Sequence, residues 1–351
     1  MNDFITKSNY RFSPIGIDLG SANVKAVQLR KKRNSITVQN TILPTPGGTI
    51  TEGIIVKPDL LVERLKKLRI DNNWHKARVN LCLPPQVLYI RRVSLPRIKD
   101  KEITRAMQLE LERNFSINPA EAVYDYCRLE PVDPDDNQQE FILAAAEKRI
   151  ARSYIRVVKE AGFSANILEI QPFSLLRSMM PCIKTSKAED YSGILVDIGY
   201  QTTSIIIAAG SSYRFFRYLR TGSADFIETL ADISGTDINQ AGILLYKRKF
   251  TAEKKLMEKA ESLAEQLQRT VTYWLEQNGN ENITPNDLRI CGGGAFIPGL
   301  AAVIGRRLAI RPKLHNSFRS DLYSTSNEKT TAQISAFFAT AHGLALRGWS
   351  A

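Results

Sequence analysis

The first clear pattern of apolar and polar positions lies between Ile15 and Lys25, which reads IGIDLGSANVK. An apolar run ends at an aspartate two residues before a glycine, small or polar residues follow, and a second apolar run begins. This alternation predicts two strands joined by a tight turn. A third strand-like segment, Ser35 to Ile42, follows the basic turn Arg30 to Arg33. The pattern therefore predicts a strand-turn-strand-turn-strand unit.

The same unit recurs from Gly193 to Ala209, which reads GILVDIGYQTTSIIIAA. Superimposing Asp18 on Asp197 aligns the glycines, the polar turns and both flanking strands. A third strand-like segment, Tyr213 to Leu219, again follows a short turn. A repeated supersecondary unit indicates a duplicated fold, so we expect two related lobes.

The segment between the two copies has strands and helices of its own. Strands are expected at Arg78–Leu83, Val87–Leu95, Val123–Leu129 and Phe141–Ala145, and helices at Lys57–Ile70, Lys99–Asn114 and Arg149–Gly162. We therefore predict an α/β protein of three units. Residues 1–77 and 163–190 form the first lobe, residues 78–162 form a small inserted α/β subdomain, and residues 191–351 form the second lobe.

After the second repeated unit, the sequence predicts three helices, a strand and a glycine-rich turn. Helices are expected at Ala224–Ile233, with Ser223 as the N-cap, at Ile238–Lys247 and at Thr251–Gln277. A strand over Leu288–Cys291 leads into three consecutive glycines, and another helix begins at about Gly299.

Length and composition describe an ordinary folded protein. The 351 residues are 43% hydrophobic and 24% charged, which is enough for two domains with a sizeable core. No apolar run approaches the ~20 residues that a membrane-spanning helix needs, and the first residues lack the pattern of a signal peptide. Four scattered cysteines without CxxC spacing argue against a disulfide framework and a structural zinc site. We therefore expect a cytoplasmic protein.

The net charge of +12 and the pI near 9.5 favour an acidic partner or surface. No helix-turn-helix, zinc finger or aromatic-basic RNA motif is present, so we predict no specific nucleic-acid partner. We interpret the basic surface as one that meets the anionic cytoplasmic face of a membrane.

Asp18 and Asp197 are the first candidate site residues, because an aspartate within a strand is costly unless it is used. An aspartate can also cap a turn, but its recurrence in two matched turns favours a function. Turns rich in Gly, Ser and Thr present N–H groups and hydroxyls to anions, and a carboxylate can hold the hydration shell of Mg²⁺. Two such turns facing across a cleft would hold a nucleoside triphosphate. Lys25 would either neutralise phosphate charge or face solvent.

A third glycine-rich element, CGGGAFIPGL from Cys291 to Leu300, follows a strand and precedes a helix. Its backbone can approach a flat ligand closely, and the helix N-terminus favours an anion. Alone this element is weak evidence, but after two matched turns it supports the same binding site.

On the motifs IDLGSANVK, VDIGYQTTS and CGGGAFIPGL, the chain resembles the actin, Hsp70 and sugar-kinase ATPase superfamily. The first two would be phosphate loops and the third an adenosine loop. Within the superfamily the chain is similar to the PilM family of type IV pilus assembly proteins, cytoplasmic relatives of the division protein FtsA. The resemblance extends over nearly the whole chain, including the Glu169–Phe173 return and Phe338–Gly348. It implies a duplicated actin-like (ribonuclease H-like) ATPase fold with an inserted small α/β subdomain.

The resemblance implies that ATP and Mg²⁺ bind between the lobes. Carried over by matching position, Asp18 and Asp197 would hold Mg²⁺ through water, and Gln171 would position the attacking water. A glutamine before proline is also ordinary turn structure, so that role has an alternative. The phosphate contacts would be Gly20, Ser21, Asn23, Lys25, Gly199, Thr202 and Thr203, and the adenosine contacts Gly292, Gly293 and Gly294.

Two features depart from the family pattern. The family usually has a glutamate and a lysine that contact the nucleoside, but this chain has Gly242 and Leu245 at those positions. Tyr200 stands where a small residue is usual and would cover part of the phosphate site. We therefore expect nucleotide binding with slow or no hydrolysis.

The resemblance further implies that the inserted subdomain docks the cytoplasmic N-terminal peptide of a bitopic inner-membrane protein of the PilN type. The strand expected at Val87–Leu95 carries Tyr89, Arg91 and Val93 on one face, which we interpret as partner contacts. A covered strand with solvated arginines is the alternative. The family forms a ring or collar under the pilus assembly platform. We therefore expect a peripheral protein at the inner face of the bacterial inner membrane, with homo-oligomers and other platform proteins as further contacts.

Two other functions of the superfamily stay open. A small-molecule kinase would need a base carboxylate in the cleft, and no convincing candidate is evident in the sequence. A filament-forming ATPase would self-associate without a membrane partner.

Overall fold

The structure is a computed structural model that describes residues 11–349 except 33–34, 76, 130–136, 184–190, 211, 248–252, 278–283, 319–322 and 324–327. Arg33 of the expected basic turn and Thr251 of an expected helix lie outside the described residues. No helix within the described ranges has the length and apolarity needed to cross a membrane.

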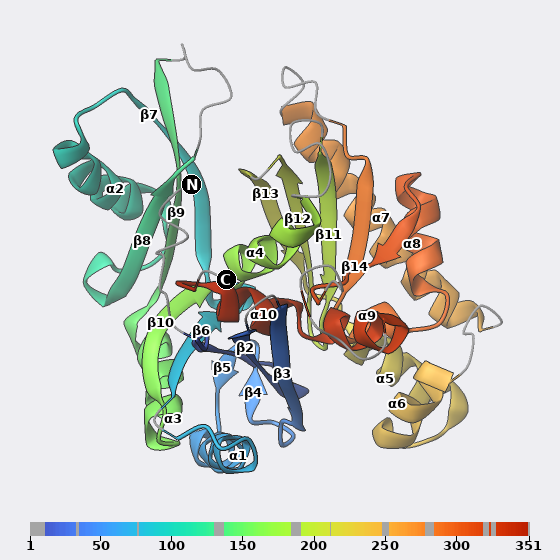
Figure 1. Cartoon of the computed structure of the whole chain (residues 1–351). Helices are drawn as coiled ribbons and strands as arrows, with labels where there is room; N and C mark the ends of the chain where they lie inside the picture. Colours follow the sequence, from blue (N-terminus) through green and yellow to red (C-terminus); the bar gives the residue numbers. More distant parts are fainter. Residues whose placement is uncertain are drawn as a thin grey trace.

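Two five-stranded sheets with the same strand order form the two lobes (Figure 1). The first sheet contains β1 (Ile15–Leu19), β2 (Asn23–Lys32), β3 (Ser35–Pro44), β6 (Arg78–Leu83) and β10 (Ser164–Ile170) in the order β3-β2-β1-β6-β10. The second contains β11 (Ser192–Ile198), β12 (Thr203–Ala209), β13 (Ser212–Leu219), β14 (Asp287–Cys291) and β15 (Pro312–Leu314) in the order β13-β12-β11-β14-β15. In both sheets the first three strands are antiparallel and the remaining pairs are parallel. The predicted duplication is therefore confirmed.

Helices cover the outer face of each sheet because each presents one apolar stripe. In the first lobe these are α1 (Pro58–Asp71) and α3 (Lys148–Glu160), which pack on each other and share a core with β1 and β6. In the second lobe they are α7 (Lys254–Gln277) and α8 (Leu300–Leu308), while α5 (Ser223–Ser234) packs on α7 and α6 (Ile238–Lys247) packs on α5. Ser223 is the first residue of α5 and not its N-cap, so that prediction is wrong by one residue. Gly222 is the N-cap, and a Cβ there would lie 2.2 Å from the carbonyl oxygen of Tyr200.

Two helices at the centre of the molecule cross between the lobes (Figure 1). Helix α4 (Gln171–Ile183) follows β10 of the first sheet and packs against β12 of the second. Helix α10 (Ala339–Leu346), which follows α9 (Glu328–Phe337), packs against β1 and β2 of the first. Each lobe thus contributes one helix to the other, and the two helices pack on each other. This exchange of helices fixes the orientation of the two repeated turns relative to each other.

The inserted subdomain is a three-stranded sheet with one helix on it. The sheet has the order β7-β9-β8, from β7 (Tyr89–Pro96), β8 (Ala122–Arg128) and β9 (Gln138–Glu147), and α2 (Asp100–Asn114) covers one face. Strand β6 and helix α3, which we expected inside the insert, belong to the layers of the first lobe. The three-stranded sheet with its helix therefore spans only residues 89–147. A short hairpin, β4 (Ile50–Thr51) and β5 (Ile54–Ile55), completes the first lobe.

Candidate functional site

The two Asp-x-Gly turns have the same backbone geometry. The N–H of Gly20 donates to the carbonyl of Asn23 at 3.1 Å, and the N–H of Gly199 donates to the carbonyl of Thr202 at 2.8 Å. A Cβ on Gly20 would lie 2.7 Å from the Asn23 carbonyl oxygen, and on Gly199 3.0 Å from that of Thr202. A side chain would clash at Gly20 and would be tightly packed at Gly199, so glycine favours the close turn at both positions.

Lys25 and the two aspartates form the charged centre of the site. Asp18 and Lys25 are cross-strand neighbours on β1 and β2, and the Lys25 Nζ lies 2.8 Å from Asp18 Oδ2. Burial opposes the charged form of Lys25, but the negative charges of Asp18 and Asp197 and the hydrogen bond to Asp18 raise its pKa above the ordinary value. Burial raises the pKa of Asp197, against the opposing effect of the Lys25 charge. The lysine is therefore a fixed positive charge beside two carboxyl groups.

Asp197 is held by side chains from α4 and β14. Its Oδ2 accepts a hydrogen bond from the Gln171 Nε2 at 3.3 Å, and its Oδ1 lies 3.6 Å from the Cys291 Sγ. The Gln171 Oε1 in turn accepts from the Ser204 hydroxyl at 3.2 Å. A Cβ on Gly292 would lie 2.4 Å from Asp197 Oδ1. The first of the three glycines is therefore required for packing around the aspartate.

A cavity of about 380 Å³ lies between the two turns. Most of the predicted site residues line it, from both lobes: Asp18, Gly20, Ser21, Asn23, Lys25, Gln171, Asp197, Gly199, Thr202 and Gly293. Tyr200 lines it as well.

Three predicted contacts do not line this cavity. Thr203 is buried, and its hydroxyl donates to the carbonyl of Thr221 at 2.7 Å, at the end of the neighbouring strand. Gly292 packs against Asp197, and a Cβ on Gly294 would lie 2.2 Å from the Ile198 side chain. Of the three consecutive glycines, Gly293 alone lines the cavity. The other two let β14 and its turn approach β11 closely.

The cavity is also lined by side chains that the sequence did not indicate. These are Ile227, Tyr246 and Phe337, of which Tyr246 and Phe337 lie near Gly293. Leu245, one of the two departures from the family pattern, is 1% exposed in the second-lobe core and faces away from the cavity. Because α6 buries Leu245 in the core, the next residue along the helix, Tyr246, lines the cavity instead.

The inserted subdomain presents two different faces. Val93 is 4% exposed in the core beneath α2, and Tyr89 packs against the same core with its ring 6.0 Å from that of Phe115. Arg91 is exposed. The opposite face of β7, with Ile90 and Arg92, lines a groove of about 620 Å³ whose other wall is β13 and the end of α7.

The fold and the cavity define the class of the protein. Two copies of the same sheet place their Asp-x-Gly turns in a single cavity, and this arrangement is the actin-like ATPase fold. MreB5 of Spiroplasma citri bound to AMPPNP has this fold, with a TM-score of 0.54, 13% identity and coverage of 96% of this chain and 95% of that chain. The ethanolamine utilization protein EutJ from Carboxydothermus hydrogenoformans is similar, with a TM-score of 0.56, 16% identity and coverage of 99% and 96%.

A family model described as type IV pilus assembly protein PilM matches residues 16–349. The chain belongs to this family. The solved structure of a PilM-PilN type IV pilus biogenesis complex is similar to this chain, with a TM-score of 0.84 and 24% identity. The match covers 97% of this chain and 99% of the chain in that structure. No curated protein matches the sequence significantly.

Proposed function

We propose that the protein binds Mg-ATP in the cavity between its two Asp-x-Gly turns. It would act as an actin-like scaffold of the type IV pilus assembly complex at the inner face of the inner membrane. The observation that carries this proposal is the meeting of Asp18, Lys25 and Asp197 in one cavity, with a glycine turn beside each aspartate. The bound AMPPNP named for MreB5, which has the same fold, supports it.

The residues present fit a metal-nucleotide ligand. Within the described residues no group of three or more His, Cys, Asp or Glu side chains is placed to hold a metal ion by itself. Asp18 and Asp197 would instead hold Mg²⁺ through its water, and the metal would neutralise phosphate charge. Lys25 would face the phosphates. The turn residues Gly20, Ser21, Asn23, Gly199 and Thr202 would offer N–H groups and hydroxyls to the phosphates.

Calorimetric titration with Mg-AMPPNP tests this assignment. Asp18→Asn and Asp197→Asn should each weaken binding at least tenfold, which is about 1.4 kcal/mol or more. Asp71→Asn is the matched control, since Asp71 pairs with Lys67 on the outer helix α1. In EDTA the difference in affinity between the wild type and these two variants should disappear, because a carboxylate without its metal repels phosphate. Unchanged affinity in both folded site variants contradicts the proposal.

We expect slow hydrolysis because both ends of the Gln171 amide are already engaged, by Asp197 and by Ser204. Gln171 must leave these partners before it can orient an attacking water. A phosphate-release assay should therefore give a rate below ~1 s⁻¹, near the low end of ordinary enzymes. A faster rate would show that the arrangement around Gln171 changes when nucleotide binds.

We also propose that the groove between the insert and the second lobe docks the N-terminal peptide of a PilN-type protein. PilN is the partner named in the similar PilM-PilN complex. Strands β7 and β13, on the two walls, each end the order of their sheet within the described chain. An extended peptide can add to such an edge. The groove offers Arg217 and the 51% exposed Tyr273, and arginine and aromatic anchors dominate binding energy at interfaces.

Fluorescence anisotropy with a labelled N-terminal peptide of the cognate PilN tests the docking site. The double variant Arg217→Ala/Tyr273→Ala should bind the peptide at least tenfold more weakly. Arg105→Ala, on the exposed side of α2, is the matched control. Mg-AMPPNP affinity should stay unchanged in both. Native peptide affinity in the double variant would place the docking site elsewhere.

A deletion test must leave the first lobe intact. Removal of Arg78 to Gly162 would take away β6 and α3, which belong to that lobe. Tyr89 pairs with Ala145 in the β7–β9 register, so a two-residue turn can join them after excision of residues 90–144. The protein without residues 90–144 should no longer bind the peptide and should still bind Mg-AMPPNP. Homo-oligomers, lipid contact and other platform partners remain predictions.

A further inference from the structure

The cavity between the Asp-x-Gly turns and the groove beside β7 meet at a short turn of the first lobe. We name it the shared turn and define it as the 3-10 turn Pro85–Val87. Pro85 lines both the cavity and the groove. Its neighbours Pro84 and Gln86 line the cavity, and Leu88, which follows the shared turn, lines the groove. The first wall of each site is therefore built on the same few residues.

The shared turn is held firmly against the first lobe. Pro84 and Pro85 fix two successive backbone φ angles, and the N–H of Val87 donates to the carbonyl of Pro84 at 3.3 Å. A Cβ on Gly53, in the β4–β5 hairpin, would lie 2.9 Å from Pro84 Cγ and 3.0 Å from Val87 Cγ1. The carbonyl of Gly53 accepts a hydrogen bond from the buried Tyr154 hydroxyl of α3 at 2.8 Å. A shift of this cavity wall would therefore carry the groove wall β7 with it.

Strand β13 connects the same two sites on the second lobe. Its residues 213–218 line the groove, and Ser223, at the start of α5, lines the cavity. The N–H of Ser223 donates to the carbonyl of Gly199 at 2.9 Å. The Thr203 hydroxyl donates to the carbonyl of Thr221 at 2.7 Å. These hydrogen bonds fix the end of β13 to the second Asp-x-Gly turn, so the second wall is also continuous from groove to cavity.

An exposed ion pair joins the two walls across the lobes. Glu52 Oε2, beside Gly53 in the hairpin, lies 4.0 Å from Nη1 of Arg220, which directly follows β13. Both side chains are more than half exposed, and an exposed pair of this kind adds little stability. A ligand that contacts both walls would restrain them more strongly. Because ordering the walls costs conformational entropy, a second ligand that needs the same order meets less of that cost.

We infer that nucleotide and peptide bind to this protein with positive coupling, so that saturating Mg-AMPPNP lowers the dissociation constant of the peptide at least about fivefold. This inference rests on the proposed nucleotide cavity and peptide groove. Each ligand contacts one wall from the first lobe and its insert and one wall from the second lobe. The shared turn and β13 carry the spacing that is set at one site to the other. By linkage, saturating peptide strengthens Mg-AMPPNP binding by the same factor.

Fluorescence anisotropy with the labelled N-terminal peptide of the cognate PilN tests the inference on the full chain. The coupling factor is the ratio of the peptide dissociation constants without and with saturating Mg-AMPPNP. Pro85→Gly frees the shared turn, so the coupling factor should fall below about twofold. A ratio reports coupling even where the variant weakens either ligand alone. Pro119→Gly is the matched control and should keep the wild-type factor, because Pro119 begins another 3-10 turn, outside both sites.

A second pair of variants tests the other wall. Thr221→Gly loosens the segment between β13 and α5 without removing a side chain that lines either site. The coupling factor should again fall below about twofold, whereas each ligand alone should bind within about threefold of its wild-type affinity. Thr236→Gly is the matched control and should keep the wild-type factor. Thr236 is also a half-buried threonine beside a glycine, in the loop between α5 and α6.

The outcomes separate the inference from the function on which it rests. If Mg-AMPPNP does not bind, or if Arg217→Ala/Tyr273→Ala keeps the peptide affinity, a proposed site fails and the inference fails with it. If both ligands bind at their sites and the wild-type factor is below about twofold, the inference alone is overturned. Weaker peptide binding with Mg-AMPPNP also overturns it. A wild-type factor that persists in both folded variants, Pro85→Gly and Thr221→Gly, would show that coupling does not pass through these walls, which overturns it as well.

Discussion

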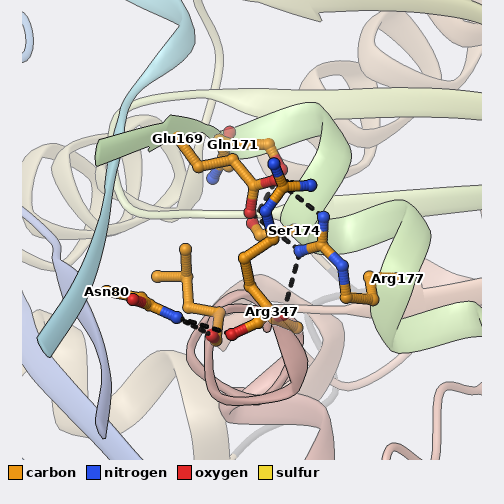
Figure 2. Close-up of polar contacts among 8 residues, drawn as sticks. Asn80, Glu169, Gln171, Ser174, Arg177 and Arg347 are labelled. Atoms are coloured by element: carbon orange, nitrogen blue, oxygen red, sulfur yellow. Dashed lines mark hydrogen bonds and ion pairs between the residues drawn. The ribbon is translucent and has the colours of Figure 1, made fainter. Parts of the chain in front are cut away.

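Replacing Gly343 by alanine is the sharpest test of the crossing between the two lobes. Gly343 lies in the middle of α10, where this helix meets Ser174 of α4. Figure 2 shows the polar network around the crossing. Arg177 pairs with Glu169 at 2.7 and 2.8 Å and donates to the carbonyl of Gly343 at 3.0 Å. The glycine therefore supports both the helix contact and the buried ion pair.

The expected cost follows from the separation of the two backbones. A Cβ on Gly343 would lie 1.7 Å from the Ser174 carbonyl oxygen, whereas ordinary contacts begin at 3.4 Å. The helices must separate by more than 1 Å, and overpacking of a core costs about 1–3 kcal/mol. The shift also disturbs the pair of Arg177 and Glu169, whose complete loss costs about 3–5 kcal/mol. The higher helix propensity of alanine offsets about 1 kcal/mol of this destabilisation. With about half of the pair's contribution lost, about 2 kcal/mol, we expect a net loss of about 3 kcal/mol.

Gly242→Ala is the matched control, because it makes the same change within α6. A Cβ there would meet no atom nearer than the Ile227 side chain at 3.8 Å, so the variant should gain about 0.5–1 kcal/mol. Urea unfolding followed by circular dichroism measures both variants against the wild-type protein. A Gly343→Ala protein within ~0.5 kcal/mol of the wild type would refute the close helix crossing.

Three further predictions concern buried groups. Arg177→Met should cost about 3–5 kcal/mol, since it removes the main partner of buried Glu169; the double variant with Glu169→Gln should regain part, and no gain in urea unfolding would contradict an ion pair. Burial lowers the pKa of His315 and His342 to about 3. Below about pH 6.5, the ordinary histidine pKa in the unfolded state, the unfolded protein binds more protons than the folded protein. The free energy of unfolding should therefore decrease as the pH is lowered, by up to about 1.4 kcal/mol per pH unit for each histidine. Equal urea midpoints at pH 7.5 and 5 would contradict this. Thr203→Val should lower the free energy of unfolding by about 1 kcal/mol and leave the Mg-AMPPNP affinity unchanged, because the Thr203 hydroxyl donates to a backbone carbonyl. Weaker nucleotide binding in this variant would show that Thr203 contacts the phosphates.

The sequence by itself determined the duplication and the charged centre of the site. Both depend on local patterns: apolar runs that end in Asp-x-Gly predict strands and tight turns, and their repetition predicts a second lobe. The cross-strand pair of Asp18 and Lys25 also follows from the short turn between β1 and β2. These features depend on neighbours along the chain, which the sequence lists directly.

The limits of the insert were decided by the tertiary structure. Strand β6 has the same apolar character as the strands of the insert, but it pairs with β1 and β10, which lie far from it in sequence. Helix α3 lies after the insert's last strand and packs on α1. Local patterns identify such elements without saying which sheet they join.

The crossing helices and part of the cavity lining were also decided by the tertiary structure. Helix α10 is buried from Ala339 to Ala345, so it has no polar face and no helical periodicity by which to predict it. Tyr246 and Phe337 lie on separate helices and line the same cavity only because the second lobe packs both near Gly293. The same long-range packing turned Thr203, Gly292 and Gly294 away from the cavity. Burial and distance between remote segments are set by the whole fold, because no local sequence pattern encodes which remote surfaces will meet.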